Sequence, residues 1–149
     1  MDDEINNILR VDQDVFFFDE KNITKLKEIA KNHPLKRSRY CLHKSDDSIT
    51  HEMIIVAHKS SNLEAHRHPD NKPESYHVIE GKLKVKIFYD DGTIKYEKIL
   101  SADQHPRMYR IHGNVWHQPI PLTEWVVYHE VATGPFNKER DVDYAKWVK

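Results

Sequence analysis

The feature that most constrains the fold is a succession of short segments rich in β-branched and aromatic residues, which fills most of the chain after residue 36. These segments cover residues 37–43, 51–58, 74–80, 83–89, 93–100 and 125–131. The turn Asp90-Asp91-Gly92 between two of them is a strong hairpin signal. Many short antiparallel strands with closely spaced turns are typical of a sandwich or a small barrel. The sequence therefore predicts an all-β fold of the jelly-roll kind.

The segment at 83–89 also indicates which of its faces is buried. One face of this segment carries Leu83, Val85, Ile87 and Tyr89, and the other face carries Lys84, Lys86 and Phe88. Because side chains on a strand alternate between its faces, the first set is expected in the core and the second mostly in solvent.

The first 35 residues have a different character and predict an appendage with a short strand and a helix. Apolar residues at helical spacing cover 23–32, Asn22 is the expected N-cap, and His33-Pro34 ends the pattern. We expect this appendage at 1–35 and a barrel with a C-terminal extension at 36–149, within a single domain overall. The apolar run Phe16-Phe17-Phe18 is expected to be buried, either on an exposed sheet edge or against a partner subunit.

Composition excludes several classes of protein. The 23 Lys and Arg residues balance 24 Asp and Glu residues, so no basic excess favours a nucleic-acid partner. Cys41 is the single cysteine, which excludes an internal disulfide framework and suits a reducing compartment. No apolar run approaches the roughly 20 residues needed to cross a bilayer. A cytoplasmic protein without a membrane partner is therefore expected.

Three histidines and one glutamate predict a metal centre. His66 and His68 are two residues apart, so on an extended strand both side chains point to the same face. Glu74 on a neighbouring strand and His117 from a later one can complete a shell of nitrogen and oxygen ligands. His77, three residues after Glu74, should face the opposite side of its strand.

Neutral imidazole together with carboxylate suits divalent iron, zinc, nickel or manganese, and spacing does not choose among them. Four protein ligands leave two positions vacant if the ion is octahedral, so a substrate can enter. The chain has 11 histidines, so some clustering along the sequence is expected by chance alone.

The order and spacing of these motifs resemble those of the cupin superfamily, and more narrowly those of the WbuC family of cupin fold metalloproteins. The general cupin pattern is seen in His66, His68, Glu74, Gly81 and His117. The narrower likeness adds Arg37, Arg39 and His43, then Asp90-Asp91-Gly92, then Glu130, Gly134-Pro135-Phe136 and Tyr144-Ala145-Lys146-Trp147. The resemblance implies a cupin-type double-stranded β-helix that holds one divalent transition metal, and a homodimer.

Two of the departures from the family pattern lie beside the predicted ligands. The gap between His68 and Glu74 is one or two residues longer than usual. His112-Gly113-Asn114 replaces the Pro-X-Gly triplet that precedes the histidine of the second motif. Asn at the glycine position is tolerated, because Asn visits the left-handed region more readily than most residues.

Further candidate residues surround the predicted metal. Arg37, Arg39 and His43 share one side of a regular strand, where two guanidinium groups suit phosphate or carboxylate; the alternative is a solvated edge strand with salt bridges. Tyr76 shares a face with Glu74 and is either a pocket or a core residue. The remaining candidates are Tyr128 for the substrate, Glu130 as an acceptor for an arginine or a ligand histidine, and Trp116 as a stacking wall or a core residue. Tyr76, His43 and Glu130 are the candidate catalytic acids or bases.

Together these residues predict a small anionic or polyhydroxylated substrate, such as a sugar or nucleotide-sugar intermediate, held by the arginines beside the metal. Lewis-acid chemistry would then support isomerisation or epimerisation. The resemblance adds a link to surface polysaccharide or O-antigen biosynthesis. Two alternatives stay open: a ferrous dioxygenase, and a module that binds metal or sugar without catalysis.

Overall fold

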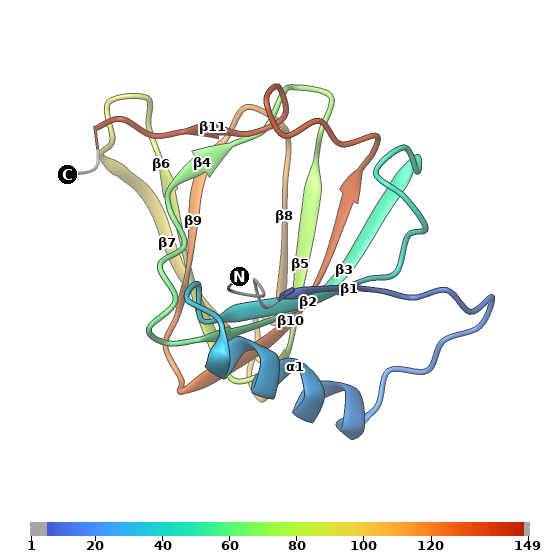
Figure 1. Ribbon diagram of the computed structural model, residues 1–149. Coiled ribbons are helices and arrows are strands. Elements are labelled where there is room, and N and C mark those ends of the chain that lie inside the picture. Colours follow the sequence, from blue (N-terminus) through green and yellow to red (C-terminus); the bar gives the residue numbers. More distant parts are fainter. Residues whose placement is uncertain (1–5, 148–149) are drawn as a thin grey trace.

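The chain folds into two β-sheets that face each other, with one helix against the outside of the larger sheet (Figure 1). The computed structural model describes residues 6–147. In spatial order, the six-stranded sheet contains β1 (Ile8–Arg10), β2 (Arg37–Cys41), β3 (Thr50–His58), β10 (Trp125–Thr133), β5 (Glu74–Glu80) and β8 (Met108–Ile111). The five-stranded sheet contains β11 (Asp143–Tyr144), β4 (His66–Arg67), β9 (Trp116–Pro121), β6 (Lys82–Phe88) and β7 (Ile94–Ser101).

Two hydrophobic cores hold these layers together. The core between the sheets contains Ile55, Tyr76, Val78, Leu83, Val85, Leu100, Val126 and Tyr128. The core between the larger sheet and the helix contains Val11, Leu26, Tyr40, Ile54, Val56 and Val127. Successive residues of β3 and β10 belong to different cores because side chains alternate across a strand, so both strands are buried on two faces.

The helix α1 (Glu20–Asn32) begins three residues before the predicted start. Its N-cap is Asp19 rather than the predicted Asn22, which is the third helical residue and completes a capping box. The Asp19 carboxylate accepts hydrogen bonds from two backbone N–H groups, and the Asn22 side chain accepts one from the Asp19 N–H. Leu26 and Ala30 are buried against β2 and β3.

The phenylalanine run does not behave as a unit. Phe16 and Phe18 pack against the core under the helix, whereas Phe17 is 83% exposed. The run is therefore not buried as a whole within this chain, and burial of Phe17 against a partner subunit stays a prediction. Alternation explains the result, because in an extended segment the middle residue points away from its neighbours.

The β6–β7 hairpin follows the predicted alternation over most of its length. Leu83 and Val85 are buried in the core. Tyr89 is 52% exposed, so its assignment to the core is wrong: β6 ends at Phe88 and a register shift precedes it. Gly92 has a φ of +88°, which the turn requires and which L side chains rarely adopt.

Between residues 6 and 147 no helix has the length and apolar character needed to span a bilayer.

Candidate metal centre

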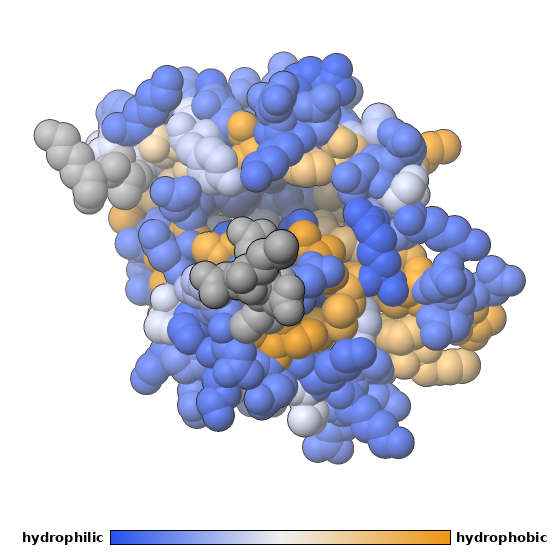
Figure 2. Space-filling model, in the orientation of Figure 1, coloured by the Kyte–Doolittle hydropathy of each residue, from blue (hydrophilic) through white to orange (hydrophobic). Residues whose placement is uncertain are grey.

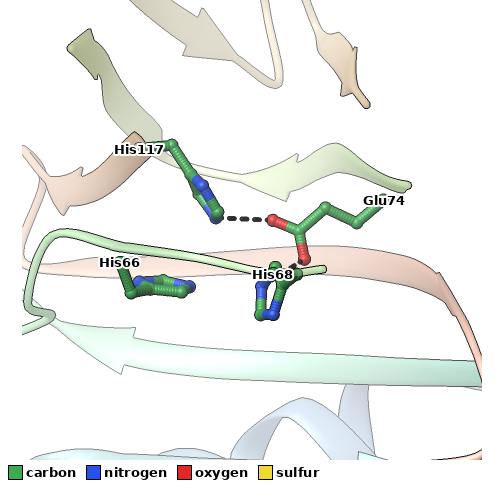
Figure 3. Close-up of side chains that lie close together, drawn as sticks. All are labelled: His66, His68, Glu74 and His117. Atoms are coloured by element: carbon green, nitrogen blue, oxygen red, sulfur yellow. Dashed lines mark ion pairs between the residues drawn. The ribbon is translucent and has the colours of Figure 1, made fainter. Parts of the chain in front are cut away.

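Four side chains from separate parts of the chain converge between the two sheets: His66, His68, Glu74 and His117 (Figure 3). Two of them are cross-strand neighbours, because His66 of β4 pairs with His117 of β9. His68 follows β4, and Glu74 is the first residue of β5 in the opposite sheet. Each residue offers one ligand atom, and these atoms all lie within 4.8 Å of one another. The cluster could therefore hold one metal ion.

The nitrogen and oxygen atoms of this cluster approach closely without satisfying one another. His117 Nε2 lies 2.7 Å from Glu74 Oε1, and His68 Nε2 lies 3.2 Å from Glu74 Oε2. Yet His117 Nε2, His68 Nε2 and Glu74 Oε1 are buried, and none has an aligned hydrogen-bond partner among the described residues. Buried polar atoms without partners are costly and rare in native proteins. An ion between them would satisfy these atoms at once.

Each of the three histidines uses its Nδ1 atom in a backbone hydrogen bond, and this leaves Nε2 free for another partner. The Nδ1 atoms of His66, His68 and His117 each lie 2.8 Å from a backbone carbonyl oxygen, those of Glu64, Asp141 and Val115 respectively. A carbonyl can only accept, so Nδ1 carries the proton and donates it. The lone pair is thereby directed to Nε2, which is how metal-binding histidines are usually oriented.

The electrostatics of the cluster also favours metal binding. Burial, followed by the neighbouring His117, lowers the pKa of His66 to about 4, so this ring is neutral at neutral pH. Burial raises the pKa of Glu74, but His117 and His68 outweigh it and hold that pKa well below its usual range. Burial likewise lowers the pKa of His68, but Glu74 outweighs it and the pKa is raised. The cluster thus contains a buried carboxylate that needs positive charge beside it.

The donor set fits a divalent transition metal: three imidazole nitrogens and one carboxylate oxygen, with vacant positions for another ligand.

The loop before His117 helps to shape the site. Asn114 has a φ of +63°, as expected for an Asn at this position, and its N–H donates to the His68 carbonyl at 2.6 Å. His77 is exposed on the outer face of β5, as alternation predicts.

A cavity of about 510 Å³ lies beside the cluster. Its lining includes His66, His68, Glu74, Arg37, Arg39, Tyr76, Tyr128 and Glu130. Figure 2 shows a hollow between the sheets on the face turned to the viewer. The cavity lies within the usual size of small-molecule sites and combines apolar walls with a few polar groups.

Outside the metal cluster, Arg39 is the residue of this lining with a buried polar atom that lacks a partner among the described residues. Its Nε atom is buried and has no hydrogen-bond partner among the described residues. Arg37 differs, because its guanidinium donates to the Asn62 carbonyl oxygen at 3.0 Å. One guanidinium group therefore keeps hydrogen-bonding capacity within the cavity.

Three further groups complete the inner wall. Glu130 is the cross-strand partner of Tyr76 in the β10–β5 ladder. Burial, together with the charge of Glu74, raises the pKa of Glu130 well above its usual range. Burial and then Glu130 raise the pKa of Tyr76 in the same way. Burial also raises the pKa of Tyr128. Both phenols are protonated at neutral pH and can donate hydrogen bonds.

His43 is not brought to the cavity with the two arginines. β2 ends at Cys41, and beyond it the His43 ring is buried, stacked on His51 at 3.9 Å between ring centroids. Its Nδ1 atom lies 3.1 Å from both the N and the O atom of Glu52. The regular strand that would align His43 with Arg37 and Arg39 stops too early.

Trp116 is buried beneath Arg67, whose guanidinium carbon lies 4.3 Å from the ring centroid, and it is not among the residues that line the cavity. Of its two expected roles, the structure supports the core residue. The cation–π contact with Arg67 and the edge contact with Trp147 account for its position.

Sequence reasoning missed the contribution of the C-terminal segment. β11 pairs with β4, which places Tyr144 opposite His66, and Asp141 supplies the carbonyl that holds His68. A backbone carbonyl leaves no signal in a sequence. The Asp141 side chain is only 4% exposed, and this burial leaves no signal in the sequence either.

Comparison with known proteins identifies the family. Residues 18–100, more than half of the chain, match the domain of unknown function DUF6016. The chain belongs to the DUF6016 family. This match includes His66, His68 and Glu74 but ends before His117. No curated protein matches the sequence.

Solved structures resemble this DUF6016 chain in fold. A protein from Shewanella oneidensis has a TM-score of 0.62 at 8% identity, over 87% of this chain and 85% of its own. CapF, the capsular polysaccharide assembling protein of Staphylococcus aureus, has a TM-score of 0.57 at 16% identity, over 72% of this chain and 31% of its own. Oxalate decarboxylase of Bacillus subtilis has a TM-score of 0.52 at 16% identity, over 64% of this chain and 24% of its own.

This chain thus spans about a quarter of the oxalate decarboxylase and less than a third of CapF. At such identities the likeness concerns the fold alone. Oxalate decarboxylase and CapF are cupin proteins, so the comparison supports a cupin-like fold for this chain.

Proposed function

We propose that this protein is a metal-binding cupin whose cavity takes a small anionic, sugar-like molecule, and that it is a metal-dependent isomerase or epimerase. One observation carries the proposal: the cluster of His66, His68 and Glu74 lines the same cavity as Arg39, whose buried Nε atom has no partner among the described residues. A ligand with a chelating group and an anionic group would satisfy both ends of the cavity.

The side chains divide the work by their chemistry. His66, His68, Glu74 and His117 would hold the ion, which would supply Lewis-acid polarisation of a carbonyl or hydroxyl group when bound. Arg39, together with Arg37, would hold the negative group through paired N–H donors.

The protonated phenols of Tyr76 and Tyr128 would donate hydrogen bonds to substrate oxygens. Glu130 lies beside Glu74 and faces the same space, so it would contact the part of the ligand nearest the metal. His43 is left out of this proposal, because it does not line the cavity.

The proposal extends to the synthesis of surface polysaccharide, with a nucleotide-sugar intermediate as the substrate. The resemblance of the sequence motifs to the WbuC family supports this extension. The likeness in fold to CapF, a capsular polysaccharide assembling protein, is compatible with it.

A non-catalytic metal or sugar-binding module is the second candidate, and one observation favours it. Burial and Glu130 raise the pKa of Tyr76 well above its usual range, so this phenol is not a base at neutral pH. A ferrous dioxygenase would use the same three histidines and one glutamate. Oxygen uptake after anaerobic loading with iron separates it from both other candidates.

The test is calorimetric titration of the metal-loaded chain with a panel of nucleotide sugars. We expect heat that disappears when the metal is removed, and binding at least about tenfold weaker in Arg39→Gln. Lys84→Gln, which removes a cation on the outer face, is the matched control. Absence of metal-dependent heat across the whole panel would overturn the proposed ligand class, and binding without turnover would favour the module.

A further inference from the structure

Residues 141–147 lie along the edge of the five-stranded sheet, and we call them the C-terminal strap. They contain β11, which pairs with β4, and Figure 1 shows the strap running past β4 toward the β6–β7 hairpin. Its first residue, Asp141, is 4% exposed and its last, Trp147, packs on other aromatic rings, whereas both residues of β11 are exposed. A segment stays ordered only if its contacts offset the loss of conformational entropy, so the two ends must hold the strap in place.

The strap supports the short strand that carries a candidate metal ligand. β4 has two residues and pairs with β9 through His66 alone. The strap supplies the rest of its support: the two residues of β11 pair with both residues of β4, and the Ala145 N–H donates to the Ala65 carbonyl at 3.0 Å. Asp143 also forms an ion pair with Arg67 at 3.0 Å. Without the strap, β4 would keep a single ladder pair.

Trp147 anchors the far end of the strap. Its ring centroid lies 4.9 Å from that of Phe88 and 5.9 Å from that of Trp116, and these two residues are partners across the β6–β9 ladder. Gly92, in the turn after β6, leaves room for the ring, because a Cβ atom there would clash with it. Trp116 and His117 are successive residues of β9, so this anchor lies on the side of the sheet opposite to the metal cluster.

We infer that Trp147 is a positioning residue for the metal centre. Docked on its three neighbours, it holds the strap, which in turn holds His66 through β11 and His68 through the carbonyl of Asp141. Outer partners of metal ligands fix the orientation of those ligands and change metal affinity when they are lost. The inference rests on the proposed metal binding and is independent of the substrate and the reaction.

The competing role is purely structural, in which Trp147 covers apolar side chains without acting on the metal. The distribution of contacts favours the positioning role. The hydrogen bonds, the ion pair and the ladder pairs of the strap fall on residues 65–68, the segment that carries two of the four candidate ligands. The same segment touches the anchor, because the guanidinium carbon of Arg67 lies 4.3 Å from the ring centroid of Trp116.

Zinc affinity of the full chain, measured by competition with a chromophoric chelator, tests the inference. We expect Trp147→Ala to bind zinc about tenfold or more weakly than the parent, the usual cost of losing an outer partner. Trp147→Phe keeps an aromatic ring on the same neighbours and should recover most of the affinity. Lys146→Ala, at the exposed residue beside it, is the matched control and should bind zinc as the parent does.

Gly92→Asn displaces the Trp147 ring from the opposite direction. Gly92 has a φ of +88°, and Asn enters the left-handed region more readily than most residues, so this variant fills the space with little added strain in the turn. It should weaken zinc binding as Trp147→Ala does. The double variant should weaken it no further, because both changes act on one contact. Gly92→Asn also decides the question if Trp147→Ala does not fold.

Cobalt(II) gives a readout that a purely structural role would not move. Its visible absorption depends on the number and geometry of its ligands, so the spectrum should change in Trp147→Ala and return in Trp147→Phe. A parent that binds no zinc would overturn the metal centre and this inference together. A parent that binds zinc, with equal affinity and the same cobalt spectrum in Trp147→Ala and Gly92→Asn, would overturn this inference alone.

Discussion

The Nδ1 atom of His68 lies 2.8 Å from the backbone carbonyl oxygen of Asp141, a residue 73 positions later in the chain. This hydrogen bond ties a candidate metal ligand to the C-terminal segment. The Asp141 carboxylate in turn accepts a hydrogen bond from the N–H of Asn137 at 2.7 Å and lies 3.9 Å from Lys72. The side chain of Asp141 therefore holds the turn whose carbonyl orients His68.

Substituting Asp141→Ala should weaken metal binding although Asp141 is not in the ligand cluster. Losing the bond to Asn137 loosens the turn and the orientation of His68, and changes of this kind cost about tenfold or more in metal affinity. Titration calorimetry with zinc measures the effect. Glu139→Ala, an exposed residue of the same loop, is the control. Equal affinity in the parent and in Asp141→Ala would contradict this role.

Substituting Leu26→Ala should lower the free energy of unfolding by about 2–5 kcal/mol, the range for fully buried leucines. Leu26 is completely buried where α1 packs on the larger sheet, so the change leaves a cavity. Urea denaturation followed by circular dichroism measures it. Val15→Ala, at a side chain that is 69% exposed, should change stability little. A loss below about 0.5 kcal/mol for Leu26→Ala would mean that the helix is not firmly packed.

Substituting Gly81→Ala should destabilise the chain by about 1–3 kcal/mol, the usual cost of a strained backbone. Gly81 has a φ of +81°, and a Cβ atom there would clash with the carbonyl oxygen of Trp125. Thermal unfolding compared with that of Lys82→Ala, the exposed next residue, measures the effect. Equal stability of the two variants would show that the turn can relax.

The sequence was informative wherever a property belongs to a few neighbouring residues. The i, i+2 spacing of His66 and His68, with Glu74 and His117 at motif spacing, predicted a cluster that the structure brings together. Alternation correctly placed Leu83 and Val85 in the core. The second prediction rests on the period of a strand, whereas the first rests on motif spacing, because β4 ends at Arg67 and His68 follows it.

The features that were missed depend on distant partners. β4 and β11 have two residues each, too short for any periodicity, and exist because they pair with each other and with β9. The end of β2 at Cys41, which separates His43 from the arginines, likewise has no local signal. The helix start was misplaced because Asn22 and Asp19 are both good N-caps, and the choice depends on which of them begins the capping box.

Acidification should destabilise the chain partly through His43. Burial lowers the pKa of this ring, and its hydrogen bond to Glu52 offsets that only in part. Below pH 6.5 the His43 ring of the unfolded chain therefore takes up a proton that the folded chain does not take up. The contribution of neutral His43 to the free energy of unfolding is complete above this pH, and it is lost as the pH falls toward the pKa of the folded state.

The measurement is the free energy of unfolding of the metal-free parent and of His43→Gln between about pH 7.5 and pH 5.5, which brackets the ordinary pKa of histidine. The difference between the two proteins should narrow on acidification. His77→Gln controls for the loss of one imidazole elsewhere. A difference that stays constant over this range would contradict the assigned direction.

The central claim is that His66, His68, Glu74 and His117 bind one divalent ion, and elemental analysis tests it most directly. The chain is purified without a metal-affinity tag, beside His66→Ala, His117→Ala and the exposed control His77→Ala. We predict about one equivalent of a transition metal in the parent and the control, and its loss from both ligand variants, in keeping with an open three-histidine, one-carboxylate site. A folded parent that takes up no divalent ion, or ligand variants that keep the metal of the parent, would contradict the account.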